Sequence, residues 1–370
     1  MSFVELDHGP DGAPARFEAP SAVLRADAPD EAADVLAALE AALAAGRWVA
    51  GYASYELGYV LEPHLLPLLP PRRRTPLLEL GVFDGPPVPA RPAAPGGRLG
   101  LLAPDWDFAA YRAAFDRAKA WIEAGDVYQV NLTMQLRGRW SGAPEAIAAA
   151  LAARQPVGHG GLVSLPGATL VCRSPELFFA LDGRGGVLNR PMKGTAPRDP
   201  DPARDARLRD GLAADPKNRA ENLMIVDLMR NDVARVAVAG SVEAVRLFTV
   251  ESYATVHQMV SEVRGRLLPG VGPAGVLRAL FPCGSITGAP KIRAMEIIRA
   301  LEPAPRGAYC GAIGWAAPDG RADFSVAIRT LTLHPDGEAT LGVGGGVVAD
   351  STARSEYREA LWKARFAAPA

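Results

Sequence analysis

Lysine is scarce in this sequence, and one lysine lies where a reactive amine would be useful. The chain has 370 residues with 40 lysines and arginines, of which five are lysine, at positions 119, 193, 217, 291 and 363. Arginine stays protonated in proteins, whereas a buried lysine can lose its proton and act as a nucleophile or base. Lys193 lies in the segment Arg190-Pro-Met-Lys-Gly-Thr195, between apolar residues and a glycine. We therefore expect Lys193 to be the candidate nucleophile.

Acidic residues on two predicted helices form a second candidate site. Glu221 falls in the first turn of a helix expected over residues 216–231. Near the C-terminus, Glu356, Glu359 and Lys363 are spaced i, i+3 and i+7, which places them on one helix face. Carboxylates from two helices can hold Mg²⁺, a hard cation that takes oxygen ligands and keeps some waters. A surface ion pair between Glu359 and Lys363 is the alternative, and the spacing alone favours it.

Two glycine-rich segments indicate places where the backbone approaches a ligand. Residues 281–291, Phe-Pro-Cys-Gly-Ser-Ile-Thr-Gly-Ala-Pro-Lys, put a loop before a helix, and free amides at a helix N-terminus attract anions. The loop lacks the Gly-Lys-Ser/Thr of a P-loop. Residues 342–346, Gly-Val-Gly-Gly-Gly, have too little chain after them for a dinucleotide-binding half. Their glycines are more typical of close approach to a ligand or another strand.

Glu176 and His257 are titratable residues in apolar surroundings. Glu176 follows a proline and precedes Leu-Phe-Phe. Burial there would raise the pKa of the carboxyl, which suits a general acid. A salt-bridged glutamate at a strand end is an equally good interpretation. His257 lies in an apolar run, where a lone histidine is more often a satisfied core residue.

The elements that must position these residues come in runs of strands rather than in strict strand-helix alternation. This order favours an α+β fold with large antiparallel sheets over a doubly wound parallel sheet. Periodicity and capping residues predict helices over residues 30–45, 108–124, 216–231, 273–280, 290–301 and 351–366. Alternation predicts strands over residues 48–59, 127–135, 163–171, 177–181, 242–249, 308–316, 324–334 and 338–343.

The chain divides into three stretches. Residues 1–84 mix one helix with strand-like pieces and are expected to contribute to the same sandwich as the rest. Residues 85–98 are rich in proline and glycine, which predicts a connecting surface loop. Residues 99–370 form the domain that carries the candidate site.

The bulk composition argues against several kinds of partner. The formal net charge is −1, which gives no electrostatic case for nucleic acid or an anionic membrane. Three widely spaced cysteines argue against a disulfide framework or structural zinc and fit a reducing cytoplasm. The first residues predict no signal peptide. The leucine-rich stretch 61–80 is interrupted by prolines and three arginines, so no membrane helix is expected there.

Eight segments in the last two-thirds of the chain carry a family resemblance. They are Gly125-Asp-Val-Tyr-Gln-Val-Asn-Leu-Thr133, Ser174-Pro-Glu-Leu-Phe178, Arg190-Pro-Met-Lys-Gly-Thr195, Arg219-Ala-Glu-Asn-Leu-Met-Ile-Val-Asp-Leu-Met-Arg-Asn-Asp232, Gly284-Ser-Ile-Thr-Gly-Ala-Pro-Lys291, Arg306-Gly-Ala-Tyr-Cys-Gly311, Phe324-Ser-Val-Ala-Ile-Arg329 and Gly344-Gly-Gly-Val-Val-Ala-Asp-Ser351. In this order they resemble the chorismate-utilising enzymes, and within them the component I branch of aminodeoxychorismate synthase. The resemblance implies the anthranilate synthase large-subunit fold, two packed antiparallel β-sheets with helices outside.

The resemblance implies a site for a small substrate with two carboxylates. It implies Mg²⁺ held by Glu221 and Glu359, with Glu356 close by, to neutralise the ring carboxylate of chorismate. Glu176 is implied to protonate the leaving C4 hydroxyl, and His257 to position or polarise the ring. The groups implied to contact the substrate, including those that receive its enolpyruvyl carboxylate, are Gln129, Thr287, Gly288, Tyr309, Arg329, Gly344, Gly345, Gly346 and Lys363.

Two positions choose the reaction within the family. The relatives that add water, the isochorismate and salicylate synthases, carry a lysine base where this chain has Gln129, and a glutamine cannot deprotonate water. Anthranilate synthases typically have alanine where this chain has Lys193. In the aminodeoxychorismate branch this lysine attacks C2 as the C4 hydroxyl leaves, and ammonia then displaces it. The isoleucine usual before the lysine is Met192 here, a change that conserves volume.

The ammonia must come from outside this sequence. No Gly-x-Cys-x-Gly nucleophile elbow occurs, so we expect a separate glutamine amidotransferase subunit or free ammonium to supply it. We predict a Mg²⁺-dependent cytoplasmic enzyme that converts chorismate to 4-amino-4-deoxychorismate for 4-aminobenzoate and folate synthesis. An anthranilate synthase component I is the alternative enzyme. A non-catalytic subunit that binds chorismate or protein partners is the alternative of another class.

Overall fold

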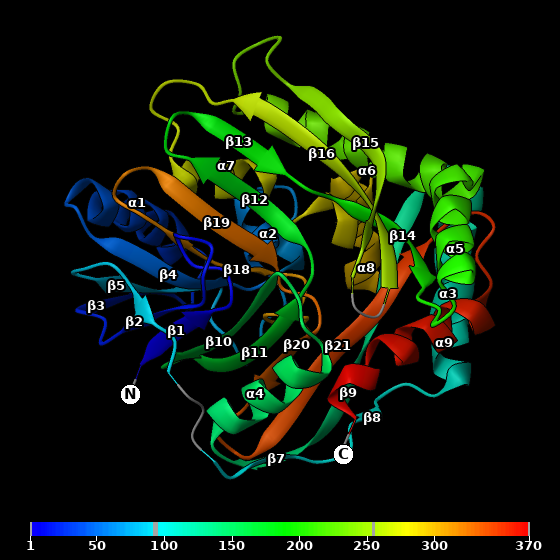
Figure 1. Ribbon diagram of the computed structural model, residues 1–370, viewed down its shortest axis with the longest axis horizontal. Helices are drawn as coiled ribbons and strands as arrows, with labels where there is room; N and C mark the ends of the chain where they lie inside the picture. Colours follow the sequence, from blue (N-terminus) through cyan, green and yellow to red (C-terminus); the bar gives the residue numbers. More distant parts are fainter. Residues whose placement is uncertain (1, 92–94, 254–255, 369–370) are drawn as a thin grey trace.

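Two large antiparallel sheets form the body of the chain (Figure 1). The structure is a computed structural model and describes residues 2–91, 95–253 and 256–368. Within these residues the first sheet has eleven strands. Its path runs through β17 (Gly288–Ala289), β9 (Gln129–Gly142), β21 (Glu338–Val347), β20 (Thr330–Leu333), β11 (Ala168–Ser174), β10 (His159–Leu165), β1 (Phe3–Leu6), β2 (Ala15–Glu18) and β6 (Val88–Pro89), with β7 (Gly97–Leu99) and β8 (Ala103–Pro104) also paired to β9.

The second sheet has ten strands within the same described ranges. Its path runs through β14 (Met192–Pro197), β16 (Val256–Arg266), β13 (Gly186–Asn189), β12 (Leu177–Asp182), β19 (Arg321–Val326), β18 (Ala312–Ala316), β4 (Trp48–Ala53), β5 (Leu78–Phe83) and β3 (Ala22–Ala26), with β15 (Glu243–Ser252) paired to β16. The predicted α+β architecture with two antiparallel sheets is confirmed.

Helices pack against both sheets. On the ten-stranded sheet, α1 lies against β3 to β5, α6 lies against β14 to β16, and α7 packs on both helices. On the eleven-stranded sheet, α3, α8 and α9 gather along β9 and β21 (Figure 1). In the part of the chain that the structure describes, no helix has the length and apolar character needed to cross a membrane. The helices are α1 (Glu31–Ala44), α2 (Leu57–Leu61), α3 (Phe108–Glu123), α4 (Pro144–Arg154), α5 (Pro202–Ala214), α6 (Pro216–Ala234), α7 (Pro273–Leu280), α8 (Lys291–Leu301) and α9 (Ala353–Lys363).

The sequence explains α3 closely. The side chain of Asp107 accepts a hydrogen bond from the backbone N–H of Ala110 at 2.8 Å, which satisfies one of the unpaired donors of the first turn. Tyr111, Phe115 and Ala118 recur on one face and are buried. Gly125 follows the helix with a φ of +84°, a conformation that costs glycine little. The predicted helix is confirmed at both ends.

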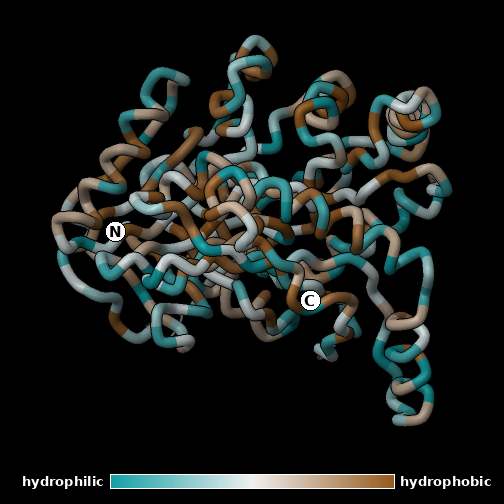
Figure 2. Tube along the Cα trace, turned by 90° about the horizontal axis from the view of Figure 1, so that it is seen from above, coloured by the Kyte–Doolittle hydropathy of each residue, from teal (hydrophilic) through white to brown (hydrophobic). Residues whose placement is uncertain are grey.

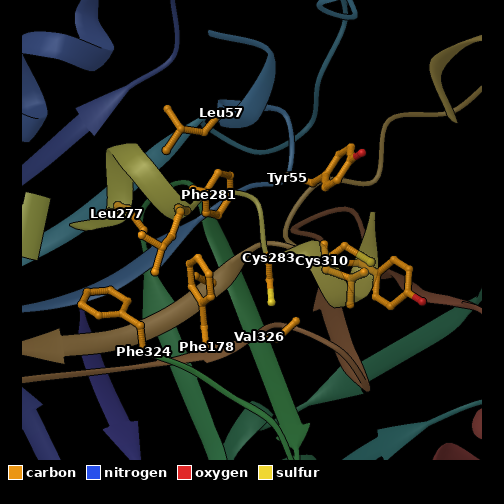
Figure 3. Close-up of a cluster of buried hydrophobic side chains, with 14 of the residues drawn as sticks. Tyr55, Leu57, Phe178, Leu277, Phe281, Cys283, Cys310, Phe324 and Val326 are labelled. Atoms are coloured by element: carbon orange, nitrogen blue, oxygen red, sulfur yellow. The ribbon is translucent and has the colours of Figure 1, made fainter. Parts of the chain in front are cut away.

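The apolar core joins the two sheets. Figure 3 shows Phe178 of β12, Phe324 of β19, Leu277 of α7 and Phe281 turned toward one another, and the rings of Phe178 and Phe281 meet edge-on at 6.2 Å. A second cluster includes side chains from both sheets, from β1 and β10 and from β4 and β18. Hydrophobic residues accordingly gather in the middle of the trace in Figure 2. Each fully buried large apolar side chain contributes about 1.5–3 kcal/mol.

Several predicted strands are wrong in their extent, and the one expected over 308–316 begins only at Ala312. The strand expected over 48–59 ends at Ala53, and α2 begins at Leu57. The strand expected over 163–171 is a hairpin, in which β10 and β11 are joined by Pro166 and Gly167. This Pro-Gly pair is an ordinary turn signal between two apolar runs.

The strand predicted over 324–334 is two strands, and they belong to different sheets. β19 ends at Val326 in the ten-stranded sheet, and β20 begins at Thr330 in the eleven-stranded one. Arg329 lies between them with a φ of +50°, which an extended strand does not allow. The chain therefore crosses from one sheet to the other at Arg329.

The N-terminal 84 residues contribute to both sheets. β1 and β2 lie in the eleven-stranded sheet, whereas β3, β4 and β5 lie in the other. Buried Glu56 fixes this segment to the rest of the chain, because its Oε1 accepts from the N–H of Arg306 at 2.7 Å and its Oε2 from that of Gly307 at 3.0 Å. The predicted connector 85–98 contains β6 and the start of β7, and its residues 92–94 lie outside the described ranges.

Candidate active site

A cavity of about 710 Å³ lies between β14 of one sheet and β21 of the other, with α6 and α9 at its sides. Several other segments also line it, among them residues 175–176, 285–286 and 328–329. The cavity therefore gathers segments that are far apart in the sequence. The predicted site residues that line it are Glu176, Lys193, Glu221, Tyr309, Arg329, Gly344, Gly345, Gly346, Glu356, Glu359 and Lys363.

An irregularity in β14 presents Lys193 to the cavity. The register of β14 with β16 shifts around this residue, and Gly194 has a φ of +89°. Such a bulge re-aims a side chain away from the regular alternation. A methyl group at Gly194 would lie 2.9 Å from Oδ1 of Asn218, so α6 can pack close behind the bulge. Burial lowers the pKa of Lys193, against the raising effect of the nearby Glu221 carboxylate. A lowered pKa increases the fraction of neutral, nucleophilic amine.

Glu176 lies between β11 and β12 and is 4% exposed. Its Oε1 accepts a hydrogen bond from the hydroxyl of Ser285 at 2.7 Å. Burial raises the pKa of Glu176 to about 7, although the Ser285 hydrogen bond and the charge of Lys193 oppose the shift. A carboxyl group that is protonated near neutral pH is matched to general acid catalysis.

The acidic residues of α9 lie at the rim of the cavity. Nζ of Lys363 lies 2.9 Å from Oε1 of Glu359 and donates to the carbonyl of Gly344 at 2.8 Å. The hydroxyl of Ser351 donates to Oε1 of Glu356 at 2.8 Å. Burial raises the pKa of Glu356, whereas burial at Glu359 is outweighed by the Lys363 charge, so that the pKa of Glu359 is lowered. The ion pair that spacing favoured is therefore present, and it borders the cavity.

The carboxylates of α9 converge above β21. A methyl group at Gly345 would lie 3.3 Å from Oε2 of Glu356 and 3.7 Å from Oε1 of Glu359, and Glu221 lines the same cavity from α6. Among the described residues, no three His, Cys, Asp or Glu side chains are grouped to hold a metal ion by themselves. These oxygen donors fit a Mg²⁺ ion that takes one or two protein carboxylates and completes its shell with water and substrate oxygens.

Glycines of β21 leave room for their neighbours. A side chain at Gly342 would collide with the ring of Tyr309, whose Cδ1 would be 2.1 Å from the added carbon. At Gly346 the added carbon would lie 3.0 Å from Nζ of Lys193 and 2.8 Å from the carboxamide carbon of Gln129. The predicted close approach of the backbone to other groups is therefore present at this strand.

Arg329 supplies a cation without an acidic partner. Its side chain lines the cavity, and no carboxylate of a described residue lies within 4.0 Å of the guanidinium in an ion pair. A guanidinium with its donors free can bind a carboxylate through two parallel hydrogen bonds. Together with Lys193 and Lys363, it makes one end of the cavity suited to an anionic group.

The turn between β21 and α9 is held from both sides. Lys217 at the start of α6 pairs with Asp350 at 2.8 Å, and Lys119 of α3 donates to the carbonyl of Ala349. Both members of the Lys217–Asp350 pair are more than half exposed. The pair joins the helix that carries Glu221 to the turn that leads into α9.

A family match accounts for this arrangement. The family of chorismate binding enzymes matches residues 7–369 of the sequence. The chain belongs to the chorismate-binding enzymes.

Similar members of the chorismate-binding family carry two names. An aminodeoxychorismate synthase of Streptomyces pristinaespiralis is 46% identical over 255 residues, which are 69% of this chain and 35% of the relative. The aminodeoxychorismate synthase component 1 of Salmonella typhimurium is 44% identical over 68% of this chain and 55% of its own length. The anthranilate synthase component 1 of Streptomyces coelicolor is 43% identical over 76% of this chain and 55% of its own length. The matched part of this chain thus spans 35% to 55% of the length of these relatives.

Solved structures share the fold of this chorismate-binding chain. The anthranilate synthase component I of Streptococcus pneumoniae aligns with a TM-score of 0.82, 23% identity, and 99% of this chain against 92% of that one. A putative 2,3-dihydroxybenzoate-specific isochorismate synthase of Bacillus anthracis aligns with a TM-score of 0.79, 23% identity, and 98% against 94%. The fold expected from the resemblance is confirmed.

His257 is not among the residues that line the cavity of this chorismate-binding chain. Its neighbours Val256 and Gln258 on β16 line the cavity, and the alternation of the strand turns His257 the other way. Its Nε2 lies 2.9 Å from Oδ1 of Asp205 on α5, and its Nδ1 lies 2.8 Å from the hydroxyl of Ser252. Both ring nitrogens of His257 are therefore engaged within the fold.

Thr287, Gly288 and Gln129 also lie outside the residues that line the cavity. The hydroxyl of Thr287 donates to the carbonyls of Cys283 and Gly284, so it holds its own turn. A side chain at Gly288 would collide with the carbonyl of Gln129 across β17 and β9. The Gln129 side chain is fully buried behind Gly346, and neither of its polar atoms has a hydrogen-bond partner among the described residues.

Sequence reasoning missed several polar residues of the site in this chorismate-binding chain. Asn131, Gln258 and Ser285 are among those that line the cavity. Asn131 lies on the polar face of the strand that was predicted over 127–135, which was the available signal. Ser285 lies two residues before Thr287 in the glycine-rich loop, and Gln258 lies on β16, for which no strand was predicted.

Proposed function

We propose that the chain aminates chorismate to 4-amino-4-deoxychorismate. The Nζ lone pair of Lys193 attacks C2, the ring double bonds shift, and the C4–O bond breaks with the hydroxyl leaving as water on a proton from Glu176. Ammonia then attacks C4, and the C2–N bond breaks to release Lys193 and restore the double bonds. One proton leaves the new amine, so chorismate and ammonia give the amine and water.

The observation that carries the proposal is Lys193 in the same cavity as Glu176. The lysine has a lowered pKa and the glutamate a raised one, so both shifts favour the uncharged forms, a free amine and a protonated carboxyl. Opposite shifts in two neighbouring groups are what nucleophilic and acid roles require. The choice against anthranilate synthase rests on Lys193, because relatives of both names match this chain.

The charges of the cavity support a substrate with two carboxylates. Arg329 and Lys363 would receive the enolpyruvyl carboxylate beside Tyr309 and the β21 glycines. Mg²⁺ would be held by Glu221 and Glu359, with Glu356 beside them and Lys363 next to Glu359. When bound, the ion would supply positive charge to offset the ring carboxylate.

We further propose that a glutamine amidotransferase subunit supplies the ammonia. The relatives from Salmonella typhimurium and Streptomyces coelicolor are both named component 1, which supports a second component in those two proteins. The product would serve 4-aminobenzoate and folate synthesis. Three free buried cysteines fit a reducing cytoplasm as the place of the reaction.

The test uses purified protein with chorismate, Mg²⁺ and ammonium, and identifies the product by mass. We expect 4-amino-4-deoxychorismate from the wild type and none from Lys193→Ala or Lys193→Arg, since arginine keeps the charge but is no nucleophile. Lys119→Arg, outside the cavity, is the matched control and should keep full activity. Without ammonium, a peptide adduct on Lys193 should accumulate. Anthranilate as the sole product would contradict the proposal, and chorismate binding without turnover would favour the non-catalytic alternative.

A further inference from the structure

We propose that Cys283 and Ser285 form a directed hydrogen-bond chain that fixes which oxygen of Glu176 carries the catalytic proton. Sγ of Cys283 lies 3.3 Å from Oγ of Ser285, which in turn lies 2.7 Å from Oε1 of Glu176. All three residues are buried. The inference rests on the proposed role of Glu176 as general acid and assigns positioning roles to two residues behind it.

The direction of the chain follows from its donors. A serine hydroxyl has one proton, and when Ser285 gives it to Oε1 its own oxygen is left to accept from the thiol of Cys283. The thiol keeps its proton, because burial and then the nearby Glu176 charge raise the pKa of Cys283 to about 12. Oε1 is thereby an acceptor, so the proton of the neutral carboxyl lies on Oε2. Glu176 lines the cavity, and Oε2 is the carboxyl oxygen that the Cys283–Ser285 hydrogen-bond chain does not contact and that can face the substrate.

The backbone around Ser285 is held by other buried groups. The hydroxyl of Thr287 donates to the carbonyls of Cys283 and Gly284, at 3.2 and 3.1 Å. The carbonyl of Ile286, just after Ser285, accepts from Nη1 of Arg306 at 2.9 Å. These bonds fix the turn. Thr287 therefore stabilises the turn itself, whereas the hydroxyl of Ser285 is directed toward Glu176.

Several charged or titratable groups share the surroundings of Glu176 and act on it besides Ser285. Cations that favour its carboxylate come from β14, from α9 and from the crossing between the sheets, whereas burial disfavours it. The backbone of Met192 also favours the carboxylate through a hydrogen bond. The side chain of Ser285 is neutral and contacts the carboxyl directly, so replacing it changes the pKa of Glu176 without changing any nearby charge. The charged or titratable groups are Lys193, Lys363, Arg329, Cys283 and Cys310.

The first test is the pH profile of kcat/KM, which reports the free enzyme. Because Glu176 must be protonated, activity should fall as pH rises through the pKa of its carboxyl. Ser285→Ala removes a donor to the carboxylate, so this alkaline limb should move to higher pH while kcat drops about tenfold or more. Ser285→Thr keeps the hydroxyl and should restore both. Ser325→Ala, which deletes a buried hydroxyl bonded to Ile313, is the control for folding and should leave the limb in place.

The second test needs no turnover. The titration of Glu176 is followed by NMR of ¹³C-labelled glutamate carboxyls, with the resonance assigned by its loss in Glu176→Gln. Its midpoint should rise in Ser285→Ala, rise less in Cys283→Ala, and return toward the wild-type value in Cys283→Ser. An unchanged midpoint in Ser285→Ala would overturn the chain even if the enzyme is active. Failure of the wild type to form 4-amino-4-deoxychorismate would overturn the proposed function and leave this titration still readable.

Discussion

The amine of Lys193 packs against the backbone of Gly346: a methyl group at position 346 would lie 3.0 Å from the lysine Nζ. The same methyl would lie 2.8 Å from the carboxamide carbon of Gln129. The amine proposed to attack the substrate therefore lies directly against the backbone of β21. Space for the reaction at this point depends on the absence of one carbon atom.

Replacing Gly346 with alanine should impair turnover more than folding. The new methyl group pushes the ends of two flexible side chains, which can move, but moving Lys193 spoils its attack geometry. A misplacement of about 1 Å can cost about 100-fold in rate. We expect kcat to fall by that order in Gly346→Ala, with a melting temperature near that of the wild type. Gly85→Ala, where nothing lies within 4 Å, is the control and should leave kcat unchanged.

Replacing Glu176 with glutamine should remove part of the pH dependence of stability. Burial raises the pKa of Glu176 to about 7, above the ordinary value of 4.5 for a glutamate. Its stabilising contribution is therefore complete below the unfolded pKa and is lost as pH rises through about 7. We expect the free energy of unfolding, measured by urea denaturation, to fall between pH 6 and pH 8. This fall should be smaller in Glu176→Gln than in the wild type. Equal losses in both proteins would contradict the shift.

Replacing Lys363 with methionine should tighten Mg²⁺ binding and weaken chorismate binding. Lys363 pairs with Glu359 at 2.9 Å, so it competes with the metal for a proposed ligand. Loss of a partly exposed ion pair is worth up to about 1 kcal/mol, which corresponds to about a fivefold lower Kd for Mg²⁺. Titration calorimetry with Mg²⁺ alone measures the first effect and the KM for chorismate the second. Arg358→Met on the same helix should change neither, and a weaker affinity for Mg²⁺ in Lys363→Met would remove Glu359 from the metal site.

Replacing Glu56 with alanine should destabilise the whole chain. The two backbone N–H groups of Arg306 and Gly307 would lose their acceptors inside the core. Each buried donor left without a partner costs about 1–3 kcal/mol, so we expect a loss of about 2–6 kcal/mol in the free energy of unfolding. Glu123→Ala, an exposed glutamate on α3, should cost about 0.5 kcal/mol or less. Similar losses for both would show that Glu56 does not link the N-terminal segment to the core.

Capping residues and apolar periodicity predicted the helices whose ends are marked in the local sequence. Helix α7 matches its prediction at both ends, and α3 matches because Asp107 and Gly125 mark its limits. The crossing at Arg329 was not predicted, because the left-handed φ falls on an arginine, although the apolar positions change phase there from Val326 and Ile328 to Leu331 and Leu333. α5 gave no signal either, since Leu212 is its one buried residue.

The site residues that could be predicted were likewise those marked by their own type and their sequence neighbours. Lys193, Glu176 and the α9 glutamates were found because their residue types and neighbours point to chemistry. The surroundings of His257 and Thr287 depend on tertiary contacts, which residue type and sequence neighbours do not show. The partner of His257 is Asp205 on the unpredicted α5, and the choice of Ser285 over Thr287 depends on how a tight turn directs its side chains.

The ion pair between Lys217 and Asp350 has a consequence for how the enzyme responds to its solution. Lys217 lines the cavity, both partners are largely in water, and the pair joins the helix of Glu221 to the turn that leads into α9. Such pairs weaken as ionic strength rises, whereas buried contacts are screened much less. Dissolved salt should therefore loosen the tie between α6 and this turn, while buried Glu176 keeps its hydrogen bond to Ser285.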